Sequence, residues 1–117
     1  MGPLIIRGQV WRVVRVSPGD PFLIDRTGVP KLATADPSTK TIRISKAVPV
    51  NMFDQVYLHE AAHAAMTEAD VTDLLSPATE ELIAWFMESH AIEVVDAVSA
   101  SLGRRVCVDG LCMGRNQ

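Results

Sequence analysis

The first half of the chain alternates apolar and polar residues over short stretches that are rich in β-branched side chains, a pattern typical of strands. Clusters of proline and glycine separate these stretches, and a helix cannot continue through them. The clusters lie at residues 18–21, 27–30 and 36–38. The predicted strands are Leu4–Ile6, Gln9–Val16 and Thr41–Ser45. We therefore expect short strands joined by turns.

The second half of the chain contains long segments without glycine or proline, in which apolar residues recur every three or four positions. This spacing predicts two helices. The first is expected over residues 51–67, with Asn51 as its N-cap. The second is expected over residues 78–102, with Pro77 in its first turn and Gly103 ending it.

The order of strands followed by helices favours an α+β fold over a repeated strand-helix-strand arrangement. We expect a small antiparallel or mixed sheet packed on the two helices. A chain of 117 residues has the length of one ordinary domain. That domain divides into a strand-rich part at residues 1–48, a helical part at 49–103 and a cysteine-containing tail at 104–117.

The net charge of -3 argues against nucleic acid as a partner, because phosphate binding needs clustered lysine and arginine. Arg7, Arg12 and Arg15 form a basic cluster, which we interpret as the exposed face of a strand. The chain has no run of about 18 apolar residues and no apolar segment behind a basic start. We therefore expect a cytoplasmic protein with no membrane partner.

Two cysteines, Cys107 and Cys112, flank an Asp-Gly pair that favours a tight hairpin turn. In such a hairpin the two side chains would face each other, and a disulfide could form. Because a cytosolic compartment keeps thiols reduced, we expect two packed thiols instead. A second zinc site at this pair would lack two of its four ligands.

The first predicted helix carries the sequence HEAAH at residues 59–63, which fits the HExxH pattern. His59 and His63 lie one turn apart on one helical face, so both imidazoles can reach a single metal ion. Glu60 would lie beside that ion without binding it and would take the proton of a metal-bound water. The alternative is that these residues merely decorate a helix surface, since the bare pattern also arises by chance. Small residues next to the motif allow close packing; they are Ala61, Ala62, Ala64 and Ala65.

Catalytic zinc takes three protein ligands and keeps one position open, so a third ligand is expected. Glu80 and Glu81 on the second predicted helix are the candidates. The HEAAH motif followed by the sequence ELIA at residues 81–84 resembles the gluzincins, the thermolysin-like class of zinc metallopeptidases. This resemblance selects Glu81 as the third ligand and implies a Zn2+ cofactor, with Glu80 as the alternative.

Residues 32–98 are also similar to the minimal metallopeptidase domains of bacteriophages and mobile elements. Trp85 stands where larger gluzincins have an aspartate that orients a zinc-bound histidine. Glu88 returns to nearly the same helical face as Glu81 and is either a partner for a histidine or, as we expect, a solvated surface glutamate. His90 is half a turn out of phase and is not expected to join the site. No residue is identified as a donor to the oxyanion.

The strand Thr41–Ser45 immediately precedes the HEAAH helix. In zinc peptidases of this class, an edge strand at this place pairs with an extended substrate. The alternative is an interior or simply exposed strand with no role in substrate binding.

These residues favour a zinc-dependent metallopeptidase that hydrolyses peptide bonds in a protein or peptide substrate, with a selective regulatory protease inside the cell as one form of this hypothesis. A second hypothesis is a zinc-binding interaction module with weak or no turnover. A third is a small structural protein without metal, in which His59 and His63 are surface residues. The sequence indicates neither the oligomeric state nor the cleavage preference.

Overall fold

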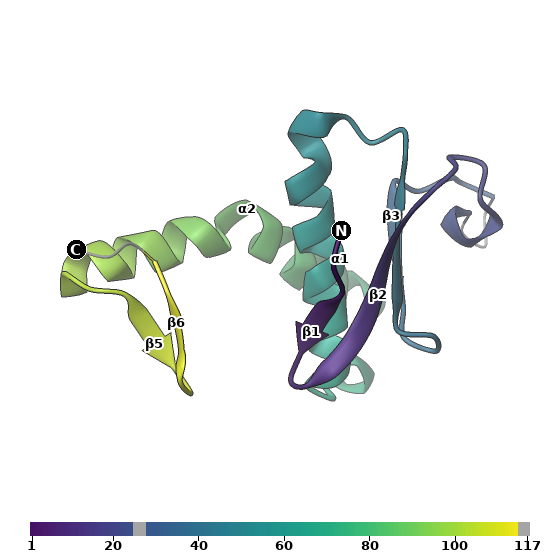
Figure 1. Cartoon of the computed structure of the whole chain (residues 1–117). Helices are drawn as coiled ribbons and strands as arrows, with labels where there is room; N and C mark the ends of the chain where they lie inside the picture. The colour runs from purple at the N-terminus through teal and green to yellow at the C-terminus, as the bar shows by residue number, and fades with distance from the viewer. Residues whose placement is uncertain (25–27, 115–117) are drawn as a thin grey trace.

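The structure, a computed structural model, describes residues 1–24 and 28–114 and has an α+β fold, as predicted (Figure 1). A mixed four-stranded sheet, two long helices and a small separate hairpin make up the chain. The strands are β1 (Leu4–Ile6), β2 (Gln9–Val16), β3 (Ala33–Asp36), β4 (Thr41–Ser45), β5 (Val106–Val108) and β6 (Leu111–Met113). The helices are α1 (Phe53–Glu68) and α2 (Pro77–Leu102), and short 3-10 turns lie at Pro21–Leu23, Val50–Met52 and Thr72–Leu74. Thr27 of one predicted turn lies outside the described residues.

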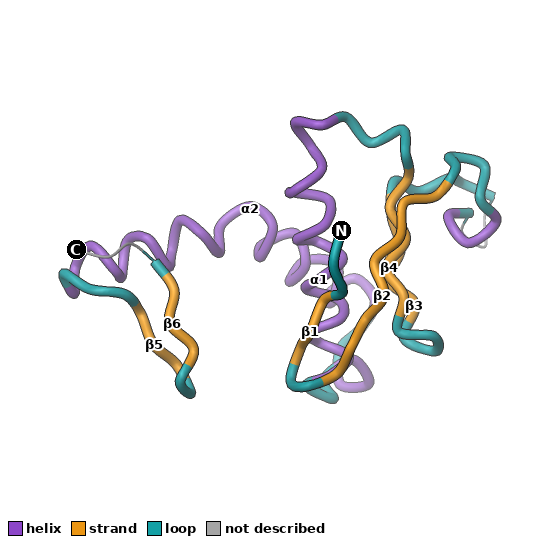
Figure 2. Tube along the Cα trace, viewed as in Figure 1, coloured by secondary structure: helices purple, strands orange, loops and turns teal. Residues whose placement is uncertain are grey.

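The sheet has the strand order β1-β2-β4-β3, which the trace in Figure 2 allows the reader to follow. The two outer pairs are antiparallel, whereas β2 and β4 run parallel. The three predicted strands of this sheet are confirmed. Strand β3 was not predicted, because Ala33–Asp36 has no β-branched run and ends in a turn-forming sequence. It nevertheless forms one edge of the sheet, and β4 lies in the interior.

The core lies between the sheet and α1. Trp11 from β2 and Ile42 and Ile44 from β4 are fully buried in it, together with Ala64 from α1. Tyr57 packs against this cluster. Burying one large apolar side chain contributes about 1.5–3 kcal/mol, so these contacts are what fixes α1 on the sheet.

The start of α1 differs from the prediction. Asn51 is not its N-cap, because Val50–Met52 forms a 3-10 turn and Met52 occupies the cap position without a side-chain hydrogen bond. The start of α2 is confirmed, since the Ser76 hydroxyl accepts a hydrogen bond from the backbone N–H of Thr79. Gly103 ends α2 in the left-handed conformation, with φ 70°, as glycine does at many helix C-termini.

Helix α2 packs against α1 through small side chains. Ala62 of α1 and Ala84 of α2 are buried in this contact, with Met66 beside them. Ala62, inside the HEAAH motif, therefore allows a close approach of the helices. Beyond this contact, the second half of α2 projects away from α1 and the sheet, and the β5–β6 hairpin lies alongside it (Figure 1). In the described ranges, no helix has the length and apolar character needed to cross a membrane.

The predicted hairpin near the end of the chain is confirmed as β5 and β6. Asp109 and Gly110 form its turn with φ values of 50° and 80°, the left-handed values that such a turn requires. Cys107 and Cys112 are direct partners across the two strands, their Cα atoms are 4.0 Å apart, and they form a disulfide. The prediction of two reduced thiols is therefore wrong for this structure. The prediction assumed that the cytosol keeps the thiols reduced. The hairpin turn instead places the two cysteines opposite each other, where a disulfide forms.

The three arginines near the start of the chain do not form a basic stripe. Arg12 and Arg15 are exposed on β2, as predicted, but they are three positions apart and so point to different faces of the strand. Arg7 lies in the turn between β1 and β2. The Arg15 guanidinium lies over the ring of Phe53. These positions give phosphate groups no continuous basic surface.

Candidate metal centre

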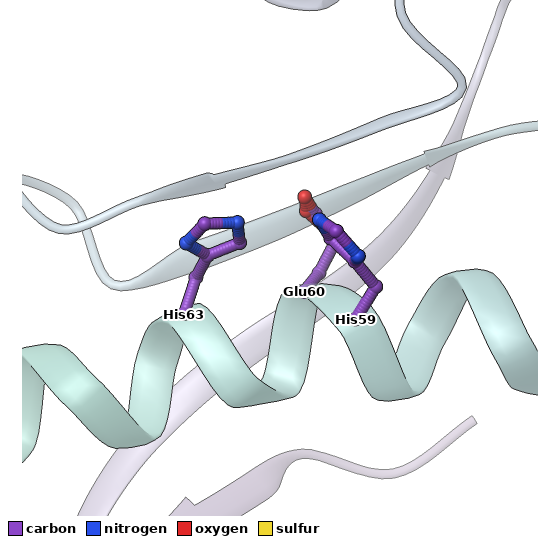
Figure 3. A group of neighbouring side chains, drawn as sticks. All are labelled: His59, Glu60 and His63. Atoms are coloured by element: carbon purple, nitrogen blue, oxygen red, sulfur yellow. The ribbon is translucent and has the colours of Figure 1, made fainter. Parts of the chain in front are cut away.

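Helix α1 places His59, Glu60 and His63 together on one side of its axis, as Figure 3 shows. The two imidazole rings lie 5.1 Å apart between centroids. One nitrogen or oxygen atom from each of the three side chains lies within 4.8 Å of the others. The i, i+4 spacing of the histidines therefore brings two metal-binding nitrogens to one point, with a carboxylate beside them.

Helix α2 brings Glu81 to the same point. One carboxylate oxygen of Glu81 lies 2.8 Å from Nε2 of His63, and the other lies 3.3 Å from Nε2 of His59. Two ligands of a tetrahedral zinc ion with bonds of about 2.0–2.1 Å are separated by roughly 3.3 Å. The spacing of these three side chains therefore suits a small divalent cation, and their donor set of two imidazoles and one carboxylate is one that catalytic zinc uses.

Two further carboxylates contact the outer nitrogens of the histidines. Oε1 of Glu88 lies 3.0 Å from Nδ1 of His59, and Oε1 of Glu80 lies 3.2 Å from Nδ1 of His63. A carboxylate at Nδ1 favours the tautomer with its proton there, which leaves Nε2 free to bind a metal. Each histidine therefore contacts its own carboxylate through Nδ1, and both histidines contact Glu81 through Nε2.

These contacts correct the interpretation of Glu88. Its side chain is only 12% exposed and reaches His59, so it is not a solvated surface glutamate. Glu80, the alternative third ligand, contacts the outer nitrogen of His63 and not Nε2. Sequence reasoning did not predict that Glu80 and Glu81 contact different histidine nitrogens. The two residues are neighbours in sequence, but their side chains diverge by about 100° around the helix.

Glu60 is buried beside the histidines, with 7% of its surface exposed. Its Oε2 has no hydrogen-bond partner among the described residues. Burial raises the pKa of Glu60, while the neighbouring His63 and His59 act in the opposite direction. A buried carboxylate with an unpartnered oxygen and a raised pKa has the properties of a general base held ready for a proton.

A cavity of about 650 Å³ opens over these side chains. Residues 31–35 at the β3 edge form one wall, and the facing sides of α1 and α2 form the others. Of the two interpretations of Thr41–Ser45, the interior strand is correct, because β4 lies between β2 and β3. The strand edge that faces the cavity belongs to β3.

Two residues near the site in sequence lie away from it in space. Trp85 is half exposed, and its ring contacts the ring of His90. His90 also contacts Phe86 and Glu93 on the outer side of α2, consistent with its predicted place out of phase with Glu81. Glu88, and not Trp85, is the residue of this turn of α2 that contacts Nδ1 of His59.

Lys31 is a cavity residue that sequence reasoning missed. Among the described residues that line the cavity, it is the one lysine or arginine. Its positive charge lowers the pKa of Glu60, against the larger effect of burial. No local pattern identified this position, because Lys31 leads into the strand that was not predicted.

The chain was compared with models of known protein families, with curated proteins and with solved structures. None of the three comparisons gives a match. The function proposed for this domain therefore rests on the geometry of its own site.

Proposed function

We propose that this domain is a zinc-dependent metallopeptidase with a gluzincin-like site. The observation that carries the proposal is the convergence of the Glu81 carboxylate on Nε2 of both His59 and His63. Glu60 lies buried and unpaired next to that point. A surface pair of histidines would not require two further carboxylates at their outer nitrogens, and both are present.

In this proposal His59, His63 and Glu81 hold the zinc, and Glu88 and Glu80 keep the two imidazoles in the tautomer that binds it. When bound, zinc supplies a Lewis acid that polarises a peptide carbonyl and lowers the pKa of water. The helix contact through Ala62 and Ala84 keeps the ligands from α1 and α2 at a fixed distance. Preorganised ligands of this kind bind without a large ordering cost.

Glu60 performs the proton transfers. Its carboxylate accepts a proton from the water whose oxygen attacks the peptide carbonyl carbon. It then gives that proton to the amide nitrogen as the carbon–nitrogen bond breaks, which yields a new carboxyl group and a new amine. The raised pKa of Glu60 suits both steps, because a stronger base takes the proton and the resulting acid can still release it.

The substrate is proposed to be a protein or peptide that binds in extended form along β3. This strand pairs with β4 on one side and faces the cavity on the other. The free edge offers backbone N–H and C=O groups for strand addition. Main-chain pairing of this kind holds a peptide whatever its side chains are, so selectivity must come from the cavity walls.

A second candidate function is a zinc-binding module with weak or no turnover. The observation that favours it is the composition of the cavity wall, where the described lining residues include no tyrosine or arginine and no third histidine. Donors of those types often stabilise the oxyanion formed during peptide hydrolysis. Metal binding is common to both candidates, and turnover separates them.

A cytoplasmic location belongs to the proposal, and it requires that the disulfide between Cys107 and Cys112 in this structure be reduced in the cell. Alkylation in intact cells before lysis should then label both cysteines. Cysteines that label only after treatment with a reductant would show that the disulfide persists in the cell and contradict this part of the proposal.

The metal site is tested by elemental analysis of the purified domain after dialysis against zinc. The wild-type protein should hold one zinc per chain, and His63→Ala and Glu81→Ala should lose it. Glu80→Ala should retain zinc with weaker affinity, because Glu80 contacts only the outer nitrogen of His63. A Glu81→Ala variant that keeps its zinc while Glu80→Ala loses it would reverse the ligand assignment.

Turnover is tested with an unstructured protein as substrate. Cleavage by the zinc-loaded wild type should fall by roughly 100- to 10,000-fold in Glu60→Gln, the usual loss when a general base is removed. Zinc content should stay at one per chain in that variant. Cleavage that persists in Glu60→Gln contradicts the mechanism, and bound zinc without any cleavage by the wild type supports the binding module instead.

A further inference from the structure

Lys31 stands out in the cavity because of the charges around it. The cavity wall contains four glutamates, and three of them, Glu80, Glu81 and Glu88, contact imidazole nitrogens. The fourth is Glu60. In the part of the chain that the structure describes, none of these carboxylates lies within ion-pair distance of the Lys31 ammonium. Lys31 therefore makes no direct ion pair with these glutamates, although its charge acts on Glu60 at longer range.

The backbone around Lys31 is held firmly although its side chain is exposed. The N–H of Lys31 donates a hydrogen bond of 2.7 Å to the carbonyl of Leu23, which is fully buried. The carbonyl of the next residue, Leu32, accepts a hydrogen bond of 2.8 Å from Ser45 on β4. A lysine side chain on a fixed backbone presents a mobile point charge over a limited part of the cavity.

The position of Lys31 along the β3 edge determines which part of a substrate it meets. Lys31 lies two residues before β3, at the N-terminal end of the cavity wall. A peptide that joins β3 in the more stable antiparallel orientation runs in the opposite direction. Its residues beside Lys31 are therefore C-terminal to the residues that pair with Ala33–Asp36.

We infer that Lys31 binds a carboxylate of the substrate on the C-terminal side of the scissile bond. This inference rests on the proposed function and names its substrate class, a peptide that is acidic on that side. The carboxylate is either an Asp or Glu side chain or the free C-terminus of the peptide. Both sources offer the same pair of oxygens to an ammonium group.

The first test compares cleavage of three peptides that share one scissile bond. One carries Glu and one carries Gln on the C-terminal side, both with an amidated end, and the third carries Gln with a free C-terminus. Wild type should show a kcat/KM roughly fivefold to tenfold higher for one carboxylate source than for its neutral partner, an advantage that declines at high salt. Lys31→Met should abolish the preference, and Lys31→Arg should retain it.

Lys46→Met is the matched control, because Lys46 is an exposed lysine just after β4 that does not line the cavity. It should leave the preference unchanged, and zinc content should be equal in all variants. Equal cleavage of acidic and neutral peptides by the wild type would overturn the inference and leave the proposed function intact. A preference that survives in Lys31→Met would also overturn it.

A binding measurement keeps the inference testable if turnover is absent. Zinc-loaded Glu60→Gln and its Glu60→Gln/Lys31→Met counterpart are titrated with the same three peptides by calorimetry. Tighter binding of a carboxylate-bearing peptide that depends on Lys31, without cleavage by the wild type, supports the inference and rejects the peptidase. Equal affinity for acidic and neutral peptides rejects the inference, whether or not the wild type cleaves.

Discussion

The two halves of α2 differ in what surrounds them. The first half packs on α1 through Ala84 and directs Glu80, Glu81 and Glu88 at the histidines of α1. The second half projects from the body of the molecule with the β5–β6 hairpin at its side (Figure 1). Its apolar side chains are largely at the surface; they include Ile92, Val94, Val98 and Leu102. We refer to this half together with the hairpin as the arm, and to the rest as the body.

The two halves show that different interactions can stabilise different parts of one continuous helix. In the body, apolar burial fixes the helix position, and that position in turn brings charged groups into contact. In the arm, the helix is maintained by its own backbone hydrogen bonds, its Gly103 end and the hairpin that packs beside Ser99. Substitutions should therefore have large effects in the body and small ones in the arm.

The largest difference is expected between two isoleucines. Ile42 in the body is fully buried, and Ile42→Ala should lower the free energy of unfolding by about 2–5 kcal/mol because it removes packed methyl groups and leaves a cavity. Ile92 in the arm is 64% exposed, and Ile92→Ala should change it by less than about 0.5 kcal/mol. Urea unfolding followed by circular dichroism measures both. Equal losses would show that the arm is buried in solution.

The next largest effect is expected from removing the metal, which joins α1 and α2 within the body. Free zinc at about 100 times its Kd should stabilise the domain by about 2.7 kcal/mol, since only the folded state has the assembled site. Thermal unfolding with zinc and with a chelator measures the difference as a shift in Tm. His63→Ala should show no shift, whereas His90→Ala, on the outer side of α2, should respond like wild type. A wild-type Tm unaffected by zinc would contradict the proposed site.

A smaller effect is expected at Glu88, which lies near the junction of body and arm. Glu88→Gln should weaken zinc binding by about 10- to 100-fold, because the carboxylate at Nδ1 of His59 would be lost. Glu93→Gln, one and a half turns further along and exposed, is the matched control and should leave the affinity unchanged. Competition with a colorimetric zinc chelator measures both affinities. Equal zinc affinities in the two variants would show that Glu88 does not contribute to zinc binding.

Much of the body could be predicted from the sequence because its signals are local. The alternation in Gln9–Val16 and Thr41–Ser45 identified two strands, and the Pro77 and Gly103 signals placed α2 almost to the residue. The spacing of the HEAAH motif likewise placed three functional groups on one helical face. Each of these inferences depends only on the geometry of a single element.

The features that were missed depend on how separate elements meet. Strand β3 has weak strand propensity and is held by pairing with β4, so Lys31 could not be assigned to the cavity from local pattern. The role of Glu88 depends on the angle between α1 and α2, which brings it to a histidine 29 positions away. The edge position of β3 follows from the strand order, which no single segment encodes.

The smallest predicted effect concerns Glu60 in the metal-free protein. Burial raises the pKa of Glu60 in the folded state above its ordinary value of 4.5, so the folded state binds a proton more tightly than the unfolded state. Stability from this group is therefore present at low pH and is lost as pH rises through the folded pKa. Glu60→Gln has no such charge and should be more stable than wild type near neutral pH, on the order of 1 kcal/mol.

The measurement is urea unfolding of both proteins with a chelator, from about pH 4 to pH 8. The advantage of Glu60→Gln should be small at the acidic end, where Glu60 is protonated, and should grow with pH. Glu93→Gln, whose glutamate is exposed, should show no comparable trend. An advantage that is constant with pH would mean that burial of the charge is not its cause. A growing advantage would show that the body gives up stability to keep the Glu60 carboxylate buried.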